Sequence, residues 1–143
     1  MHIDGLDDAA IRQVLTQTRR IAVVGASATP QRASHGVTAF LIDRGYDVTP
    51  VNPGLAGQSL LGRPVVASLD EAGPFDMVDV FRSLDQVPPI VDDAIRLGAR
   101  TLWLQLGVIH EPAAARARAA GLVVVMDRCP LIETRRLGLS APA

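Results

Sequence analysis

The segment with the clearest chemical potential runs from Gly25 to Ser34, reads GASATPQRAS, and lies between an apolar run and a helical pattern. In a strand–loop–helix unit, the backbone N–H groups of the first helical turn have no partner inside the helix and attract an anion. Gly25 permits a tight turn, Ser27 and Thr29 carry hydroxyl donors, and the Arg32 guanidinium can make a charge-assisted contact to a phosphate. The loop is longer than the roughly 2–6 residues that such a connection needs. A phosphate-binding loop is therefore favoured over the alternative that Gly25 and Ser34 only shape the turn and cap the helix.

Four further segments of turn-forming or polar residues follow apolar runs. They are Asn52-Pro53, Phe81-Arg82, Gln105-Leu106-Gly107 and Asp127-Arg128-Cys129. In open parallel sheets, ligands bind outside the carboxyl ends of the strands, at the point where the strand order reverses. The sequence therefore predicts a crevice at that edge of a parallel sheet.

A dinucleotide-binding fingerprint is largely missing from the first loop. Its G-x-G-x-x-G positions hold Gly25, Ser27 and Pro30, and no acidic residue follows the second predicted strand to hold a ribose diol. A nicotinamide cofactor is therefore a minor alternative. Flavin mononucleotide is also disfavoured, because the chain has one Trp and one Tyr to stack on the flavin ring.

Cys129 and the histidines are the candidates for catalytic or metal chemistry. Cys129 is the only cysteine, which excludes an intramolecular disulfide and fits a reducing cytoplasm. Its thiol is either a packing group, the more frequent role of a free cysteine, or a redox or nucleophilic group. His35 lies at a predicted helix start, where it either contacts a phosphate or takes a turn or capping role. The spacing of His2, His35, His110 and Cys129 matches no metal site, so no metal is predicted.

Composition and charge limit the partners. The 143 residues predict a single domain over 1–143, with a formal net charge of −1, and all 14 basic residues are arginine. This charge gives no electrostatic case for nucleic acid or an anionic membrane, and no apolar run approaches the roughly 20 residues that cross a bilayer. The acidic N-terminus is unlike a signal peptide. We therefore expect a cytoplasmic protein with a small-molecule ligand, and leave a protein partner open.

The elements that position these residues alternate between apolar strands and amphipathic helices. Strands are predicted over Arg20–Val24, Asp47–Val51, Asp76–Val80, Thr101–Leu106 and Leu122–Met126. Helices are predicted over Asp7–Thr18, Ser34–Arg44, 87–95 and Glu111–Ala120. Between Gly54 and Gly73 we expect a loop, a short extended piece around Arg63–Val66 and a turn at Ser68–Ala72. The predicted fold class is a single-domain, Rossmann-like α/β fold, doubly wound, with about five parallel strands and helices on both faces.

Several of these segments together resemble the small stand-alone CoA-binding proteins. They are GASATPQRASHGV, VTPVNP, the pair Phe81-Arg82, LWLQLGVI and VMDRCPLIE, which occur in the family's order over about residues 10–135. That family is similar in fold to the N-terminal domain of the succinyl-CoA synthetase α subunit. Many members have a lysine where this sequence has Gly54, and the resemblance then leaves Arg63 or Arg82 to replace that phosphate contact.

The resemblance implies a CoA-binding role for each matching segment. The loop around the CoA phosphates matches Gly25, Ala26, Ser27, Thr29, Arg32 and Ser34. The turn beside the adenosine matches Asn52 and Pro53, and the segment after the third strand matches Phe81 and Arg82. The strand end near the pantetheine arm matches Gln105, Leu106 and Gly107, and the closing turn matches Asp127, Arg128, Cys129 and Pro130.

The function that the resemblance implies is binding of coenzyme A, or of an acyl-CoA, at the carboxyl ends of the strands. The protein is then a non-catalytic binding, carrier or regulatory module. The alternative is a small enzyme, an oxidoreductase or an acyl-CoA-handling protein, that uses a nucleotide cofactor with Cys129 or His35 in the chemistry.

Overall fold

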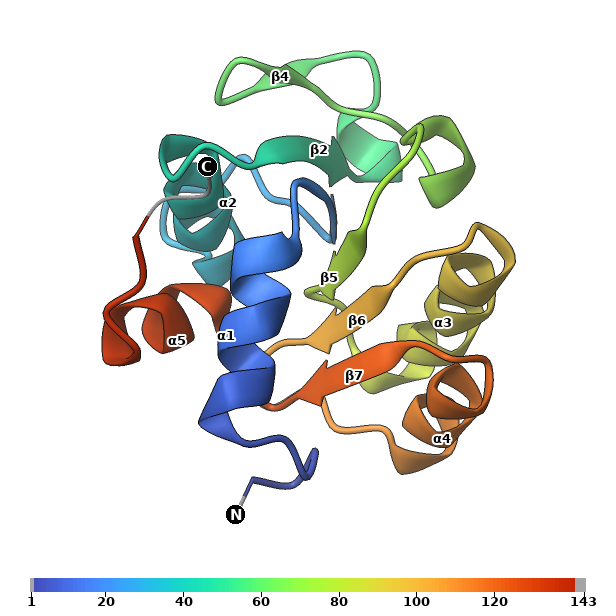
Figure 1. Ribbon diagram of the computed structural model, residues 1–143. Coiled ribbons are helices and arrows are strands. Elements are labelled where there is room, and N and C mark those ends of the chain that lie inside the picture. The colour runs from blue at the N-terminus through green and yellow to red at the C-terminus, as the bar shows by residue number, and fades with distance from the viewer. Residues whose placement is uncertain (1, 141–143) are drawn as a thin grey trace.

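A five-stranded parallel sheet forms the centre of the computed structural model, which describes residues 2–140 (Figure 1). In spatial order, the strands are β2 (Asp47–Val51), β1 (Arg20–Val24), β5 (Met77–Val80), β6 (Thr101–Leu104) and β7 (Val123–Met126). Every pairing between neighbours is parallel. The three central strands are buried along almost their whole length, as expected for a sheet that is covered on both sides. The predicted fold class is confirmed.

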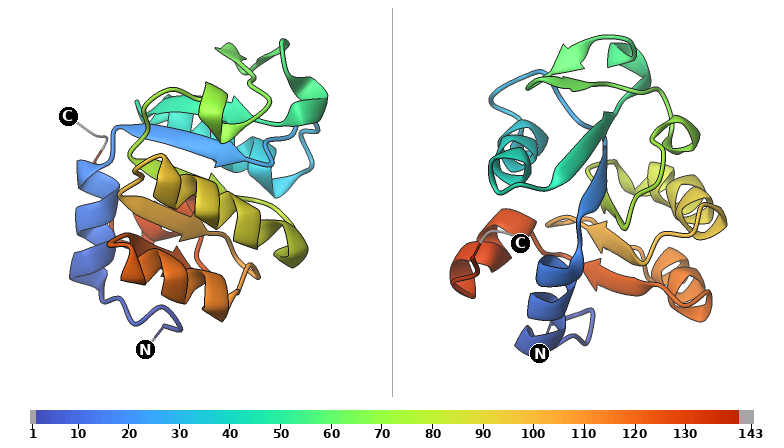
Figure 2. Two further views of the ribbon diagram at one scale, coloured as in Figure 1. Left: turned by 90° about the vertical axis from the view of Figure 1, so that its right-hand side faces the viewer. Right: turned by 45° about the horizontal axis from the view of Figure 1, so that its top comes forward.

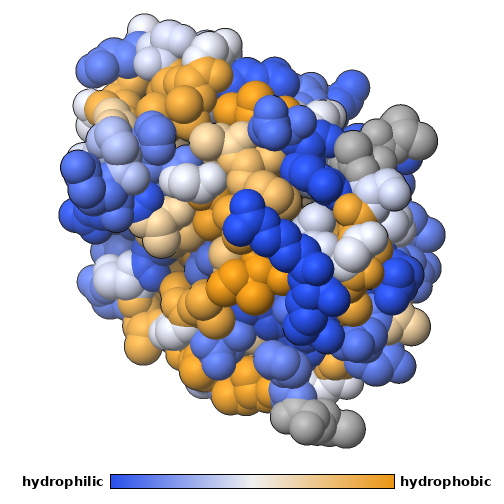
Figure 3. Space-filling model, turned by 90° about the vertical axis from the view of Figure 1, so that its left-hand side faces the viewer, coloured by the Kyte–Doolittle hydropathy of each residue, from blue (hydrophilic) through white to orange (hydrophobic). Residues whose placement is uncertain are grey.

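Helices cover both faces of this sheet (Figure 2). One layer consists of α1 (Asp8–Gln17), α2 (Ala33–Asp43) and α5 (Pro130–Arg136), and the other of α3 (Val87–Arg96) and α4 (Glu111–Ala119). Strand side chains alternate between the layers, so Met77 and Trp103 face α1, α2 and α5, whereas Val78 and Leu102 face α3 and α4. The outside of the first layer carries both apolar and polar residues, and some of the apolar ones adjoin one another (Figure 3). No helix within residues 2–140 is long and apolar enough to cross a membrane.

The strand order reverses beside β1. The helix α2 leads from β1 to its neighbour β2, whereas α3 and α4 lead from β5 to β6 and from β6 to β7 on the opposite face. The chain therefore leaves the adjacent strands β1 and β5 in opposite directions. This is the switch point at which open α/β sheets form a crevice.

The long connection from β2 to β5 is ordered by contacts with the end of β2. It contains the short helix η1 (Pro53–Leu55), the hairpin of β3 (Ser59–Leu60) and β4 (Arg63–Pro64), and the short helix η2 (Leu69–Glu71). Its predicted extended piece is β4 together with Val66, which bridges to Val51. The predicted turn at Ser68–Ala72 corresponds to η2. A further short helix, η3 (Leu84–Gln86), leads into α3.

Two predicted segments differ from the structure: one strand is shorter than predicted, and one predicted turn leads into a helix. The predicted strand over Thr101–Leu106 ends at Leu104, because Gln105 begins a turn in which its carbonyl accepts the Val108 N–H at 2.8 Å. The segment after Cys129, predicted as a closing turn, continues into α5. Pro130 opens that helix in its first turn, where no amide hydrogen is required.

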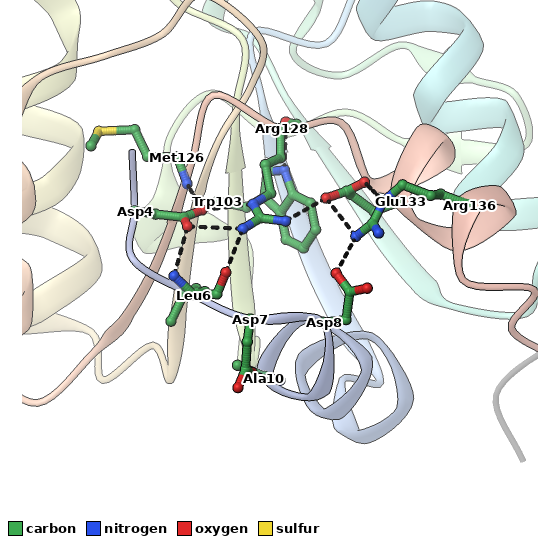
Figure 4. A network of polar contacts seen from close by, with 10 residues as sticks. All are labelled: Asp4, Leu6, Asp7, Asp8, Ala10, Trp103, Met126, Arg128, Glu133 and Arg136. Carbon is green, nitrogen blue, oxygen red and sulfur yellow. Dashed lines mark hydrogen bonds and ion pairs between the residues drawn. The ribbon is translucent and has the colours of Figure 1, made fainter. Parts of the chain in front are cut away.

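A buried charge network fastens the N-terminal segment to the end of β7 and to α5 (Figure 4). The Arg128 guanidinium donates to the Asp4 carboxylate at 2.8 and 3.0 Å and to Glu133 at 2.6 Å, and the three side chains are at most 5% exposed. Glu133 also accepts from Arg136, which reaches Asp8 of α1. Burial acts to raise the pKa of Asp4, but the hydrogen-bonded Arg128 holds that pKa below its usual value. The ion pair joins residues 124 positions apart.

Candidate functional site

Two adjoining pockets open at the carboxyl ends of β1 and β5, and Gly25 and Arg82 line both of them. The larger pocket, of about 260 Å³, lies between the start of α2 and the segment after β6. It is lined by Gly25, Ser27, Arg32, Ala33, Ser34, Phe81, Arg82, Gln105, Leu106 and Val108. The smaller pocket, of about 190 Å³, lies between the end of β2, η2 and the start of α3. It is lined by Val24, Gly25, Val51, Pro53, Ala67, Ser68, Leu69, Arg82, Gln86, Ile90 and Asp93.

The start of α2 meets the larger pocket without a side-chain cap. Arg32 is the N-cap residue, its backbone is extended, and its side chain accepts no hydrogen bond from the helix. The loop before it is held by Ser27, whose Oγ accepts from the Thr29 N–H at 3.0 Å, and by the Thr29 carbonyl, which accepts from the Arg32 N–H at 3.0 Å. Ser34 lies inside the helix and is not its cap. The free N–H groups of this first turn give the pocket a positive end.

Two guanidinium groups of the crevice are free to bind an anion. Within residues 2–140, neither Arg32 nor Arg82 takes part in an ion pair or donates a side-chain hydrogen bond. Arg63 instead pairs with Asp47 at 2.8 Å, at the beginning of β2 and away from both pockets. Of the two arginines that the resemblance offered in place of the lysine, Arg82 lines the crevice and Arg63 does not.

Gly25 is required by a close contact inside the protein. Its φ is +87°, and a Cβ at this position would lie 2.3 Å from the Phe81 carbonyl oxygen. The surrounding backbone is held on both sides, because the Gly25 N–H donates to Val51 and the Phe81 N–H donates to Val24. Glycine at this position lets the ends of β1 and β5 approach each other. This approach is a second reason for glycine here, in addition to the phosphate contact that the sequence led us to expect.

Asn52 ties the end of β2 to the loop after β1. Its Nδ2 donates to the Ala26 carbonyl at 2.8 Å, and its Oδ1 accepts from the Gly54 N–H at 2.8 Å. Ala26 is fully buried, so its side chain belongs to the core. Asn52 therefore holds two crevice-forming loops together without lining either of the two pockets, while Pro53 lines the smaller pocket.

The segment after β6 forms one wall of the larger pocket. Gln105 is 5% exposed and Leu106 is 55% exposed, and both line the larger pocket. The Gly107 N–H donates to Asp127 Oδ1 at 2.8 Å, and Asp127 itself has a φ of +59°. Asp127, which the sequence placed only in the closing turn, thus holds this wall. Aspartate tolerates such a left-handed backbone better than most residues, and that tolerance is a weak sequence signal for the turn.

Some predicted site residues lie outside the two pockets. The Arg128 guanidinium, expected at the ligand, is 1% exposed and is occupied by Asp4, Glu133 and the Leu6 carbonyl, so it is unavailable to a phosphate. Cys129 is 7% exposed and packs in the core beneath α1, α2 and α5. The others that line neither pocket are Ala26, Thr29, His35, Asn52, Gly107, Asp127 and Pro130. Within the described chain, no group of three or more His, Cys, Asp or Glu residues is arranged to hold a metal ion.

Asp79 is a buried acid that the sequence analysis did not single out. It lies in β5 within the run MVDV, its side chain is fully buried, and neither carboxyl oxygen has a hydrogen-bond partner among residues 2–140. Burial raises the pKa of Asp79 well above its usual value. Its signal in the sequence was one acidic residue inside an otherwise apolar strand.

The fold and crevice define a Rossmann-like α/β domain with two pockets at its switch point. Comparison with known proteins gives its family: the CoA binding domain matches residues 19–135, and the chain belongs to that family. The uncharacterized protein YneT of Bacillus subtilis (strain 168) is 39% identical over 122 residues, which cover 85% of this chain and 89% of YneT.

Solved structures share the architecture. A hypothetical protein from Pyrococcus horikoshii OT3 superposes with a TM-score of 0.92 at 37% identity, over 97% of each chain. The apo dinucleotide-forming acetyl-coenzyme A synthetase 1 of Ca. Korarchaeum cryptofilum superposes with a TM-score of 0.69 at 22% identity. That match covers 80% of this chain but 27% of the synthetase, and it shows a shared fold alone.

The Gly25 contact predicts a loss of stability that a positive φ alone does not explain. Gly98→Ala is the matched control, because Gly98 has a φ of +80° but open space where its Cβ would lie. The left-handed backbone costs about 1–2 kcal/mol in either variant. Gly25→Ala should lose about 1–3 kcal/mol more, since Phe81 must move. Urea unfolding measures both, and equal losses would show that the Phe81 carbonyl moves freely.

The raised pKa of Asp79 predicts a pH-dependent penalty. The folded protein keeps this proton at pH values where the unfolded chain has lost it, so the free energy of unfolding falls as the pH rises above about 4. Asp79→Asn cannot ionise and should be the more stable protein near neutral pH. The difference between the two proteins should vanish at low pH and grow by up to about 1.4 kcal/mol per pH unit. Parallel stability curves in urea unfolding would contradict an acid with a raised pKa.

Proposed function

We propose that this protein binds coenzyme A, or an acyl-CoA, across the two pockets and acts as a non-catalytic binding, carrier or regulatory module. One observation supports this proposal above the others. Arg32 and Arg82, which have no ion pair among residues 2–140, lie beside Gly25 and the start of α2, which has no side-chain cap. Guanidinium groups and helix N–H groups are the donors that proteins use for phosphates. Membership of the CoA binding domain family supports CoA as the source of those phosphates.

The shape of the crevice fits an extended ligand better than a compact one. The two pockets, of about 260 and 190 Å³, meet at Gly25 and Arg82. Each is smaller than the roughly 300–1,000 Å³ of a typical small-molecule site. In the proposed complex, the phosphates lie where the pockets meet, the adenosine lies beside Pro53, and the pantetheine arm follows Gln105 and Leu106.

The positions of the reactive side chains favour binding over catalysis. Cys129 is buried in the core, and neither Cys129 nor His35 lines either of the two pockets of the crevice. A nucleophile or general base must come within hydrogen-bond reach of the reacting group. The larger pocket is instead lined by groups that are suited to holding a ligand. They are the backbone N–H groups at the start of α2, the hydroxyls of Ser27 and Ser34, two guanidinium groups and the amide of Gln105.

Ligand identity is tested by thermal unfolding with CoA and with NAD. At a hundredfold excess over its Kd, a ligand adds about 2.7 kcal/mol, which for a domain of this size raises Tm by about 5–10 °C. CoA should produce a shift of this order and NAD a much smaller one, because the end of β2 offers Asn52 and no acidic residue for the ribose diol. Equal shifts would mean that the crevice does not discriminate CoA from a dinucleotide.

The arginines are tested by titration calorimetry with CoA. Arg32→Ala and Arg82→Ala should each weaken binding about ten- to a hundredfold, because each removes a charge-assisted contact worth about 1.5–3 kcal/mol. The matched control is Arg116→Ala, since Arg116 pairs with Asp92 on the outside of α3 and α4. It should bind CoA like the wild type. A control variant as weak as the other two would move the phosphate site away from the β1–β5 switch point.

A further inference from the structure

Two buried polar side chains share one face of the sheet behind the larger pocket. In β5, Asp79 is paired in register with Val23 of β1 on one side and Trp103 of β6 on the other. Gln105 lies two residues beyond Trp103, and its N–H still bonds to the Val80 carbonyl at 3.4 Å. Gln105 lies just beyond the end of β6 and lines the larger pocket together with Arg32 and Ser34 at the start of α2. It is therefore on the α2 side of the sheet, which is also the side that Trp103 and its register partner Asp79 face.

Among residues 2–140, the surroundings of Asp79 supply no unpaired charge to compensate a carboxylate. The helices that cover this face bring buried residues that are apolar or carry hydroxyls, among them Val37 and Thr38 of α2 and Thr134 of α5, and one buried charged residue, Glu133 of α5. The titratable groups buried on the same side are the Cys129 thiol, Tyr46, whose hydroxyl bonds to the Leu15 carbonyl, and the network of Asp4, Arg128 and Glu133, which is paired within itself. Within residues 2–140, Asp79 takes part in no ion pair.

The unsatisfied atoms of the two side chains are all acceptors. Both carboxyl oxygens of Asp79 and Oε1 of Gln105 are shielded from solvent and have no hydrogen-bond donor in the described part of the chain. A carboxylate and an amide oxygen cannot satisfy each other, whereas a protonated carboxyl group has one O–H to donate. We propose that Asp79 carries a proton, donates it in a hydrogen bond to Oε1 of Gln105, and so fixes the Gln105 carboxamide with its NH2 directed into the crevice.

This arrangement makes Gln105 a hydrogen-bond donor toward the larger pocket. The identity of the ligand in this inference rests on the proposed function. With Oε1 held inward, Gln105 offers N–H donors to whatever occupies the larger pocket. The matching group on the ligand is a hydrogen-bond acceptor, such as a carbonyl oxygen of CoA. A flipped amide would present an oxygen and repel that acceptor. Asp79 is thus a positioning residue that acts through Gln105 without touching the ligand.

Titration calorimetry with CoA on four variants and one control variant tests the proposal. Asp79→Asn retains a donor to Oε1 and should bind within about twofold of the wild type, whereas Asp79→Val removes the donor and should bind about tenfold more weakly. Gln105→Leu should be equally weak, and adding Asp79→Val to it should weaken binding no further, because Asp79 acts only through Gln105. Thr134→Val is the matched control: its hydroxyl is also buried and unpartnered on this side, and it should bind normally.

The proposal is overturned if folded Asp79→Val binds CoA like the wild type, if Asp79→Asn is as weak as Asp79→Val, or if the effects of Asp79→Val and Gln105→Leu add. A measurement on the wild type alone covers the case in which the valine variant does not fold. The carboxyl ¹³C signal of Asp79, assigned by its loss in Asp79→Asn, should report a protonated acid at neutral pH. An ionised Asp79 overturns the proposal. This ¹³C signal does not depend on CoA. A wild type that fails to bind CoA therefore refutes the proposed function, while the ¹³C signal still decides whether Asp79 is protonated.

Discussion

The close approach of β1 and β5 at Gly25 is the constraint on which the rest of the site depends. A Cβ there would meet the Phe81 carbonyl at 2.3 Å, so only glycine lets the two strand ends lie this near to each other. Because the chain leaves β1 and β5 in opposite directions, their ends open the crevice, and Gly25 lies in both of its pockets. The same contact brings Arg82, which follows Phe81, over the loop that leads to α2.

In this chain without lysine, the arginines differ in whether a carboxylate among residues 2–140 pairs with them. Arg63, Arg96, Arg116 and Arg136 are held by carboxylates on the surface, and Arg128 is consumed in the interior. Arg32 and Arg82 at the crevice have no such partner among the described residues. An arginine already held by a carboxylate would have to give up that partner before binding a phosphate, whereas these two are available from the start. Placement of acidic residues therefore matters as much to this site as placement of arginine.

Local pattern predicted the fold and most of the crevice, since apolar strands, helical periodicity and glycine loops each depend on neighbours in the sequence. Strands β1 and β2 lie where they were expected, and residues that follow β1, β2, β5 and β6 line the two pockets, whereas those that follow β7 do not. The role of Arg128 was not predictable in this way, because its partner Asp4 lies 124 positions away. The helix α5 was missed because it is short and follows a residue pattern typical of a turn. Asp79 and Gln105 become related only when β5 and β6 pair, so no single segment reveals them.

The N-terminal segment has a consequence for how the molecule behaves among copies of itself. A parallel sheet ends in two strands with unpaired backbone groups, and such edges are templates for aggregation. At β7, the carboxylate of Asp4 accepts the Met126 N–H at 3.1 Å. At β2, Pro50 has no N–H to offer, and its carbonyl already accepts from Val66. At both edge strands, residues of the chain itself thus occupy or remove backbone groups that could pair with another strand. Removing the N-terminal segment with Asp4 would expose the Met126 N–H at the edge of β7, where a strand of another chain could then pair.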